Sequence, residues 1–81
     1  MFKLIVASPA KKFIKTLSKS HQRAILLSLD DLKEDPSIGK LLSKELSGKM
    51  SYKVGSYRII YLIKDDLVKV TKIGHRSTIY N

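Results

Sequence analysis

The first part of the chain shows one apolar run followed by helical spacing. The run FKLIVA, residues 2–7, is short and rich in β-branched side chains, which predicts a strand. Ser8 and Pro9 then suit a helix start, because serine caps helix N-termini and proline fits the first helical position. Apolar residues recur at helical spacing from Phe13 onward, so a first helix is predicted over residues 9–18.

A longer helical pattern follows at residues 19–34. Its apolar positions fall on one stripe, and Pro36 ends it because proline cannot continue a helix. Residues 36–48, PSIGKLLSKELSG, are expected to form a connection with room for a helical turn. The stripe consists of Ile25, Leu29 and Leu32, with Leu26 beside it.

The pattern then changes to strands. Three β-rich runs, at residues 50–54, 57–63 and 67–73, are separated by the short turn signals Gly55-Ser56 and Asp65-Asp66. This spacing predicts an antiparallel meander, so the element order becomes β-α-α-β-β-β. We therefore predict an α+β fold in a single domain of residues 1–81. Its two N-terminal helices should pack on one face of an antiparallel β-sheet, which leaves the other face free for function.

Period-two alternation divides the middle strand into two faces. The richer apolar set should meet the helices. Arg58 alternates with this set, so it is expected on the open face. In the preceding strand Lys53 alternates with apolar residues and is expected on the same side. The helix-facing set consists of Tyr57, Ile59, Tyr61 and Ile63.

The charge distribution adds a candidate partner. Sixteen Lys and Arg against seven Asp and Glu give a formal net charge of +9. Residues 1–29 hold six basic residues and no acidic one, residues 30–48 three basic and five acidic, and residues 49–81 seven basic and two acidic. Two strongly basic segments flanking a mildly acidic one favour a surface for a polyanion such as nucleic acid. The alternative is a basic protein without such a partner.

Several kinds of chemistry lack the residues they need. The chain has no cysteine, its two histidines have no carboxylates at metal-ligand spacing, and its four glycines form no phosphate-binding loop. We therefore expect no metal and no cofactor. The N-terminal apolar run is about six residues, too short for a signal segment or a membrane span. This predicts a cytoplasmic protein with no membrane partner.

What remains is a set of cations with one phenol, which suits RNA cleavage without a metal because RNA carries its own nucleophile, the 2′-OH. An arginine fork matches the phosphate oxygens, a lysine crowded by other cations loses its proton more readily, and a tyrosine ring stacks on a base. The plain alternatives are a solvated strand lysine at Lys53 and a tyrosine at position 80 that only docks the chain end. The set consists of Lys53, Arg58, His75, Arg76 and Tyr80.

Two motifs resemble the RelE/ParE toxin superfamily. YKVGSYRIIYLI, residues 52–63, matches its pattern of a basic residue, an apolar residue, Gly, any residue and Tyr-Arg before an apolar strand. VTKIGHRSTIY, residues 70–80, matches the later Gly-His-Arg motif with a near-terminal tyrosine. The resemblance covers essentially the whole chain. It implies a ribosome-dependent endoribonuclease that cuts mRNA in the A site and is neutralised by an acidic, RelB-like antitoxin.

The resemblance also implies roles for individual residues. Lys53 matches a basic position of the active strand, and Arg58 matches the arginine that contacts the scissile phosphate. Arg76 matches the arginine of the last motif and Tyr80 the terminal tyrosine. All four are therefore expected in the catalytic site.

One departure from the family affects proton transfer. The family often has a second basic residue where this chain has Ser51, which cannot act as a cationic base. Lys49 or His75 is expected to replace it, and histidine exchanges protons most readily near neutral pH. Residues expected to contact the RNA are Lys49, Ser51 and Lys72.

Three other functions stay open. One is a ParE-like toxin that inhibits DNA gyrase by binding, although such members typically lack the combination of arginine, lysine and tyrosine found here. Another is a non-catalytic homologue that binds RNA or the ribosome through charge alone. A third is a degenerate toxin made inactive by Ser51.

Overall fold

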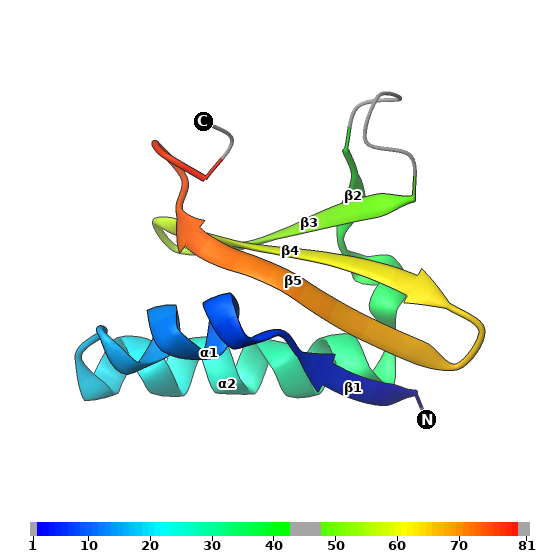
Figure 1. Cartoon of the computed structure of the whole chain (residues 1–81), viewed down its shortest axis with the longest axis horizontal. Helices are drawn as coiled ribbons and strands as arrows, with labels where there is room; N and C mark the ends of the chain where they lie inside the picture. The colour runs from blue at the N-terminus through cyan, green and yellow to red at the C-terminus, as the bar shows by residue number, and fades with distance from the viewer. Residues whose placement is uncertain (1, 43–47, 80–81) are drawn as a thin grey trace.

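The computed structural model describes residues 2–42 and 48–79 of the chain. In these ranges two helices cover one side of a five-stranded sheet, and the opposite side carries no helix (Figure 1). The predicted α+β fold, with both helices on one face and the order β-α-α-β-β-β for its main elements, is confirmed. Of the predicted connection, residues 43–47 lie outside the described residues, as does Tyr80 of the predicted site.

The two helices differ in how their N-termini are closed. In α1 (Ser8–Lys15) Ser8 lies inside the first turn, and Ala7 occupies the cap position without a side-chain hydrogen bond, so the expected serine cap is wrong. The helix also ends three residues early, because Thr16 turns its hydroxyl back to the carbonyl of Phe13 at 2.7 Å. In α2 (Lys19–Glu34), which has the predicted bounds, Ser18 accepts a hydrogen bond from the backbone N–H of His21 at 3.4 Å.

A short segment ties α2 to the sheet edge. The predicted helical turn is present as a 3₁₀ turn, η1 (Pro36–Ile38), and it is followed by the two-residue strand β2 (Lys40–Leu41). The hydroxyl of Tyr61 donates to the carbonyl of Pro36 at 2.6 Å and accepts from the N–H of Gly39 at 3.1 Å. A strand of two residues shows no alternation, so β2 was not foreseeable from the hydrophobic pattern.

The sheet is mixed rather than wholly antiparallel. Its strand order is β1-β5-β4-β3-β2, and β3 (Lys49–Val54), β4 (Tyr57–Lys64) and β5 (Leu67–His75) form the predicted antiparallel meander. At one edge β1 (Lys3–Val6) pairs in parallel with β5, so the antiparallel expectation is wrong there. Parallel strands need a long crossover connection, which the two helices begin by carrying the chain across one face of the sheet.

The core lies between the helices and the sheet, as the alternation predicted. Tyr61 and Ile59 are fully buried on the helix side of β4, and Tyr57 packs against the same cluster. Ile63, also expected there, is 36% exposed because it lies near the end of the strand. No described helix is long and apolar enough to span a membrane. The buried cluster consists of Ala10, Ile25, Leu29, Leu32, Ile59, Tyr61, Val68, Val70 and Ile73.

Candidate functional site

A β-bulge at Thr71 decides which side chains of β5 reach the open face. Tyr61 of β4 pairs with Val70, whereas its neighbour Ile60 pairs with Lys72, so Thr71 is the extra residue. The hydroxyl of Thr71 donates to the carbonyl of Ile60 at 3.2 Å. Because one residue is inserted, side chains beyond it change sides. Val70 therefore faces the helices, and Lys72 faces away from them.

All Lys and Arg side chains of the described strands share that open face. Paired residues of neighbouring strands lie on the same side of a sheet, and the register places each of these cations opposite another open-face residue. The described strands contain no Asp or Glu. We call this surface the basic face. Its cations are Lys3, Lys40, Lys49, Lys53, Arg58, Lys64, Lys69 and Lys72.

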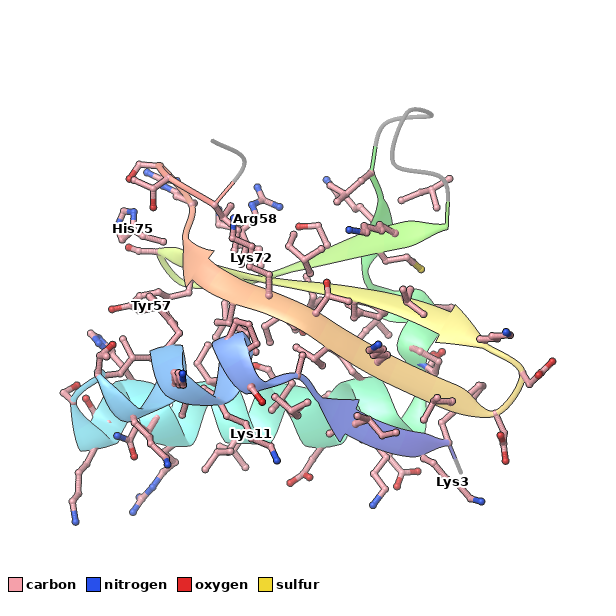
Figure 2. The ribbon with its side chains drawn as sticks, viewed as in Figure 1. Lys3, Lys11, Tyr57, Arg58, Lys72 and His75 are labelled. Carbon is pink, nitrogen blue, oxygen red and sulfur yellow. The ribbon has the colours of Figure 1, made fainter. Side chains whose placement is uncertain are left out.

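Arg58 is the half-buried cation near one end of this face. Lys53 lies directly opposite it in β3, and Gly74 lies opposite it in β5. One guanidinium nitrogen, Nη1, donates to the hydroxyl of Ser51 at 3.4 Å, and Ser51 itself is 3% exposed. Figure 2 shows Arg58 and Lys72 close together on the side of the sheet away from the helices. The structure therefore brings four predicted residues together, namely Ser51, Lys53, Arg58 and Lys72.

A shallow groove of about 280 Å³ opens beside Arg58. It lies where β2 begins, so the chain from Ile38 to Lys40 forms one wall, and β3 with Arg58 forms the other. Three cations line it, and Arg forks in particular match phosphate oxygens in geometry and charge. The lining residues are Ile38, Gly39, Lys40, Ser51, Tyr52, Lys53 and Arg58.

The chain after β5 turns back over the basic face. The N–H of Ile79 donates to the carbonyl of His75 at 2.9 Å, and the carbonyl of Ile79 accepts from the ammonium of Lys72, also at 2.9 Å. The Ile79 side chain is 4% exposed and packs on Gly74, where a Cβ atom would lie 3.0 Å from its Cδ1. The glycine of the Gly-His-Arg motif thus makes room for the returning chain.

Arg76 lies in this turn and is exposed. Its backbone N–H donates to the carbonyl of Ser56 at 2.8 Å, which fastens the turn to the β3–β4 connection. The turn therefore starts close to the strand end that carries Arg58.

His75 lies on the opposite side of the sheet from Arg58. It pairs with Tyr57, and the two rings are 5.9 Å apart at an angle of 81°. Its Nδ1 atom accepts from the N–H of Ser77 at 3.2 Å and lies 2.7 Å from the Ser77 hydroxyl. The sheet thus separates His75 from Lys53 and Arg58, with which the sequence had grouped it.

Lys49, which was expected to contact the RNA, lies on the basic face, opposite Leu62. Sequence reasoning missed Lys40, which lines the groove, because it belongs to a strand of two residues, too short to be recognised. It also missed Lys69, although the alternation in LVKV places that lysine on the opposite face of the strand from Val68 and Val70. In the described ranges no three His, Asp or Glu side chains lie close enough together to hold a metal ion.

Comparisons with known proteins assign nearly the whole chain to one family. The profile described as the ParE toxin of type II toxin-antitoxin systems, parDE, matches residues 4–80. Toxin RelG of Mycobacterium tuberculosis is 40% identical over 53 residues, which cover 62% of this chain. The match spans 61% of that relative's length.

Solved structures share the fold over nearly the full length. A chain of the toxin-antitoxin complex RelBE2 from Mycobacterium tuberculosis superposes with a TM-score of 0.84 at 28% identity, covering 93% of this chain and 98% of that one. The isolated E. coli RelE toxin superposes with a TM-score of 0.80 at 24% identity, covering 99% of this chain and 92% of that one. The similarity to the isolated E. coli RelE toxin is a similarity of fold.

Proposed function

This chain belongs to the ParE toxin family of type II toxin-antitoxin systems, and we propose that it is a RelE-like endoribonuclease within that superfamily. It would cleave translated mRNA in the ribosomal A site and so stop protein synthesis in the cytoplasm. The observation that carries this proposal is the placement of Arg58 beside Ser51 and opposite Lys53, on a sheet face where the described strands contribute cations and no carboxylate.

The chemistry follows from what RNA supplies. The 2′-oxygen forms a bond to the adjacent phosphorus, the bond from phosphorus to the 5′-oxygen breaks, and one proton leaves the 2′-OH while another reaches the 5′-oxygen. Negative charge grows on the phosphate in the pentavalent state. Arg58 is assigned to bind the non-bridging oxygens, since its fork can form two parallel hydrogen bonds to them.

The remaining roles are assigned by position. Lys53 lies across the ladder from Arg58, within the same groove, and supplies a second positive charge. Because His75 lies on the other side of the sheet, proton removal falls to a lysine of the basic face, Lys49 or Lys53. Arg76 and Tyr80 take the roles that their motif positions imply, stabilising charge and stacking on a base.

Ribosome dependence follows from the shape of the face. The groove beside Arg58 is about 280 Å³, at or below the lower limit of typical ligand pockets, roughly 300 Å³. Such a groove cannot by itself hold an RNA strand in the bent conformation that the reaction needs. The ribosome would hold the mRNA in place, and the basic face would approach an exposed phosphate.

The neutralising partner would be an acidic, RelB-like antitoxin. Two of the matched structures, from Mycobacterium tuberculosis and E. coli, are toxin-antitoxin complexes named RelBE2 and RelBE. A partner that is partly unfolded when free can wrap a large surface as it folds. For this chain such a partner would cover the basic face or displace the turn of residues 75–79 that lies over it.

Primer extension on mRNA from cells that express the protein tests the proposal. We expect breaks within translated regions, absent when translation initiation is blocked and absent with Arg58→Ala. Purified protein should act poorly on free RNA. Intact mRNA in growth-arrested cells would overturn the nuclease proposal. If an extract of the same cells then inhibits DNA supercoiling by purified gyrase, the chain would be assigned to gyrase inhibition. Efficient cutting of naked RNA would overturn the ribosome dependence.

A further inference from the structure

A second hollow lies on the helix side of the sheet, away from the basic face. Its volume is about 350 Å³, within the range of sites that hold small organic groups. Its walls come from the first turns of α2, from the β3–β4 turn and from the end of β5. The lining residues are His21, Ala24, Val54, Gly55, Ser56, Tyr57 and His75.

Three rings meet in this hollow. Tyr57 lies at the centre, 5.3 Å from the ring of His21 at 65° and 5.9 Å from the ring of His75 at 81°. Behind it, Phe13 contacts Tyr57 edge to face at 5.9 Å and connects the group to the core. Tyr57 is half-buried, whereas both histidines are exposed. The core thus fixes Tyr57, and the histidine rings remain accessible as surfaces on which a planar ligand can stack.

The histidines also offer hydrogen-bond donors. A backbone N–H can only donate, so the contact from Ser77 N–H makes Nδ1 of His75 an acceptor. The neutral ring of His75 therefore carries its proton on Nε2. Nδ1 of His21 lies 3.3 Å from the hydroxyl of Tyr57, and when that hydroxyl donates, the proton of His21 is also on Nε2. A ligand with ring nitrogens or carbonyl oxygens at its edge can accept from such donors.

The surroundings of the hollow favour an anionic polymer. The first turn of α2 contains no acidic residue. Arg76 adjoins the lining residue His75 in sequence, and its backbone N–H is bonded to the carbonyl of Ser56 at the rim. The chain carries a net charge of +9. A phosphate beside a bound ring would therefore meet Arg76 and no opposing carboxylate from these elements.

We propose that this hollow binds an unpaired nucleobase of RNA, stacked against the histidine rings and hydrogen-bonded by Nε2–H. The site is separate from the cleavage groove, since His75 and Arg58 lie on opposite faces of the sheet. It would hold a base of the RNA that surrounds the cleaved strand, and it goes beyond the proposed cleavage because it takes no part in the bond-breaking step.

The test is a titration of the full chain, isotope-labelled, with adenosine and with uridine. These nucleosides carry no phosphate, so the basic face contributes little to their binding. We expect saturable NMR shifts at Gly55, Ser56 and the rings of His21 and His75, with a dissociation constant on the order of 1 mM. Inorganic phosphate should instead shift resonances of the basic face.

Two variants and one control make the assignment specific. Ala24 is an exposed residue of α2 that lines the hollow, so Ala24→Phe should fill the space and weaken nucleoside binding at least tenfold. His75→Ala removes one stacking ring and should weaken binding severalfold. Leu27 is 59% exposed and does not line the hollow, so Leu27→Phe is the matched control and should bind as the wild type does.

Three results would overturn the proposal. They are the absence of saturable shifts with either nucleoside, unchanged affinity in a folded Ala24→Phe variant, and equal affinity for p-cresol, which mimics a tyrosine side chain. The last result would make the hollow a slot for an aromatic side chain of a protein partner. Because no cleavage is measured, the outcome is independent of primer extension.

Discussion

Gly74 lies directly opposite Arg58 in the ladder between β4 and β5, and the side chain of Ile79 packs in the space that a Cβ atom on Gly74 would occupy. The adjacent pair, Tyr57 and His75, faces the helices instead. This relationship divides the Gly-His-Arg motif between two surfaces: its glycine, opposite Arg58, makes room for Ile79 on the basic face, and its histidine contributes a ring to the second hollow.

Arg58→Ala should reduce mRNA cleavage by on the order of 10²–10³, the usual effect of removing one donor that stabilises a charged transition state. Arg58→Lys should restore part of the activity, because it keeps the charge and loses the fork. Growth inhibition and primer extension measure the effect, beside a thermal melt. Lys64→Ala is the matched control, since Lys64 lies on the same face at the far end of β4. Equal loss in both variants would mean that only overall charge matters.

Ser51→Ala tests how Arg58 is positioned. The variant removes the hydroxyl that accepts from Nη1 of Arg58, a hydrogen bond to a charged group worth about 1.5 kcal/mol. We expect cleavage to fall by up to about tenfold while the fold is retained. Wild-type cleavage in this variant would show that the backbone alone positions Arg58.

Arg76→Ala should reduce toxicity strongly with little change in stability. Arg76 is exposed, and such substitutions usually alter the free energy of unfolding by about ±0.5 kcal/mol or less. Arg76→Lys should retain partial activity for the same reason as at Arg58. We expect Tyr80→Phe to behave like Arg76→Ala. Full toxicity of Arg76→Ala, or unfolding of Tyr80→Phe, would make the last motif structural.

Tyr61→Phe should destabilise the fold by about 1–3 kcal/mol, because the carbonyl of Pro36 and the N–H of Gly39 lose their partner. Burial raises the pKa of Tyr61 above its ordinary value of about 10. The stability that this phenol contributes is therefore present below about pH 10 and is lost as pH rises through its folded-state pKa. Urea titrations at pH 7 and above pH 10 should show the difference between wild type and variant narrowing. A constant difference would contradict this account.

Association with an acidic antitoxin should slow as ionic strength rises. Charges steer the encounter of complementary surfaces, and salt screens them over about 10 Å at 0.1 M. Stopped-flow mixing at salt concentrations from about 0.05 to about 0.5 M measures the association rate, because the screening length shortens across this range. The Lys64→Ala and Lys69→Ala variants should each reduce the salt slope slightly. An association rate indifferent to salt would remove the electrostatic basis for this partner.

The sequence predicted the helices and strands better than it predicted which face of the sheet each side chain occupies. Alternation in YRIIYLI placed Arg58 correctly, because β4 is regular from Tyr57 to Ile60 and its apolar set is clear. In LVKVTKI the same rule would put Lys72 on the face of Val68 and Val70. The bulge at Thr71 reverses this, and no residue type in that run announces an inserted position.

The site was predicted in part for the same reason. Lys53, Arg58 and Ser51 lie on strands without a bulge between them, so motif spacing was enough to group them. His75 follows the bulge and lies on the other face. The parallel pairing of β1 was also beyond the pattern, because a short apolar strand carries no sign of the direction of its neighbour.

The pairing of β1 with β5 has a consequence for how the protein is made. Residues 3–6 pair with residues 67–70, so β1, the first of the described strands to be synthesised, waits for β5, the last of them. Contacts this distant in sequence close slowly, because the entropy of the intervening chain must be lost first. A nascent chain can form its helices and the β3–β4 hairpin early, but Lys69 and Lys72 join the basic face only at the end. The basic face is therefore completed only once β5 has been synthesised. A chain interrupted before residue 67 lacks this strand, which pairs with both β1 and β4.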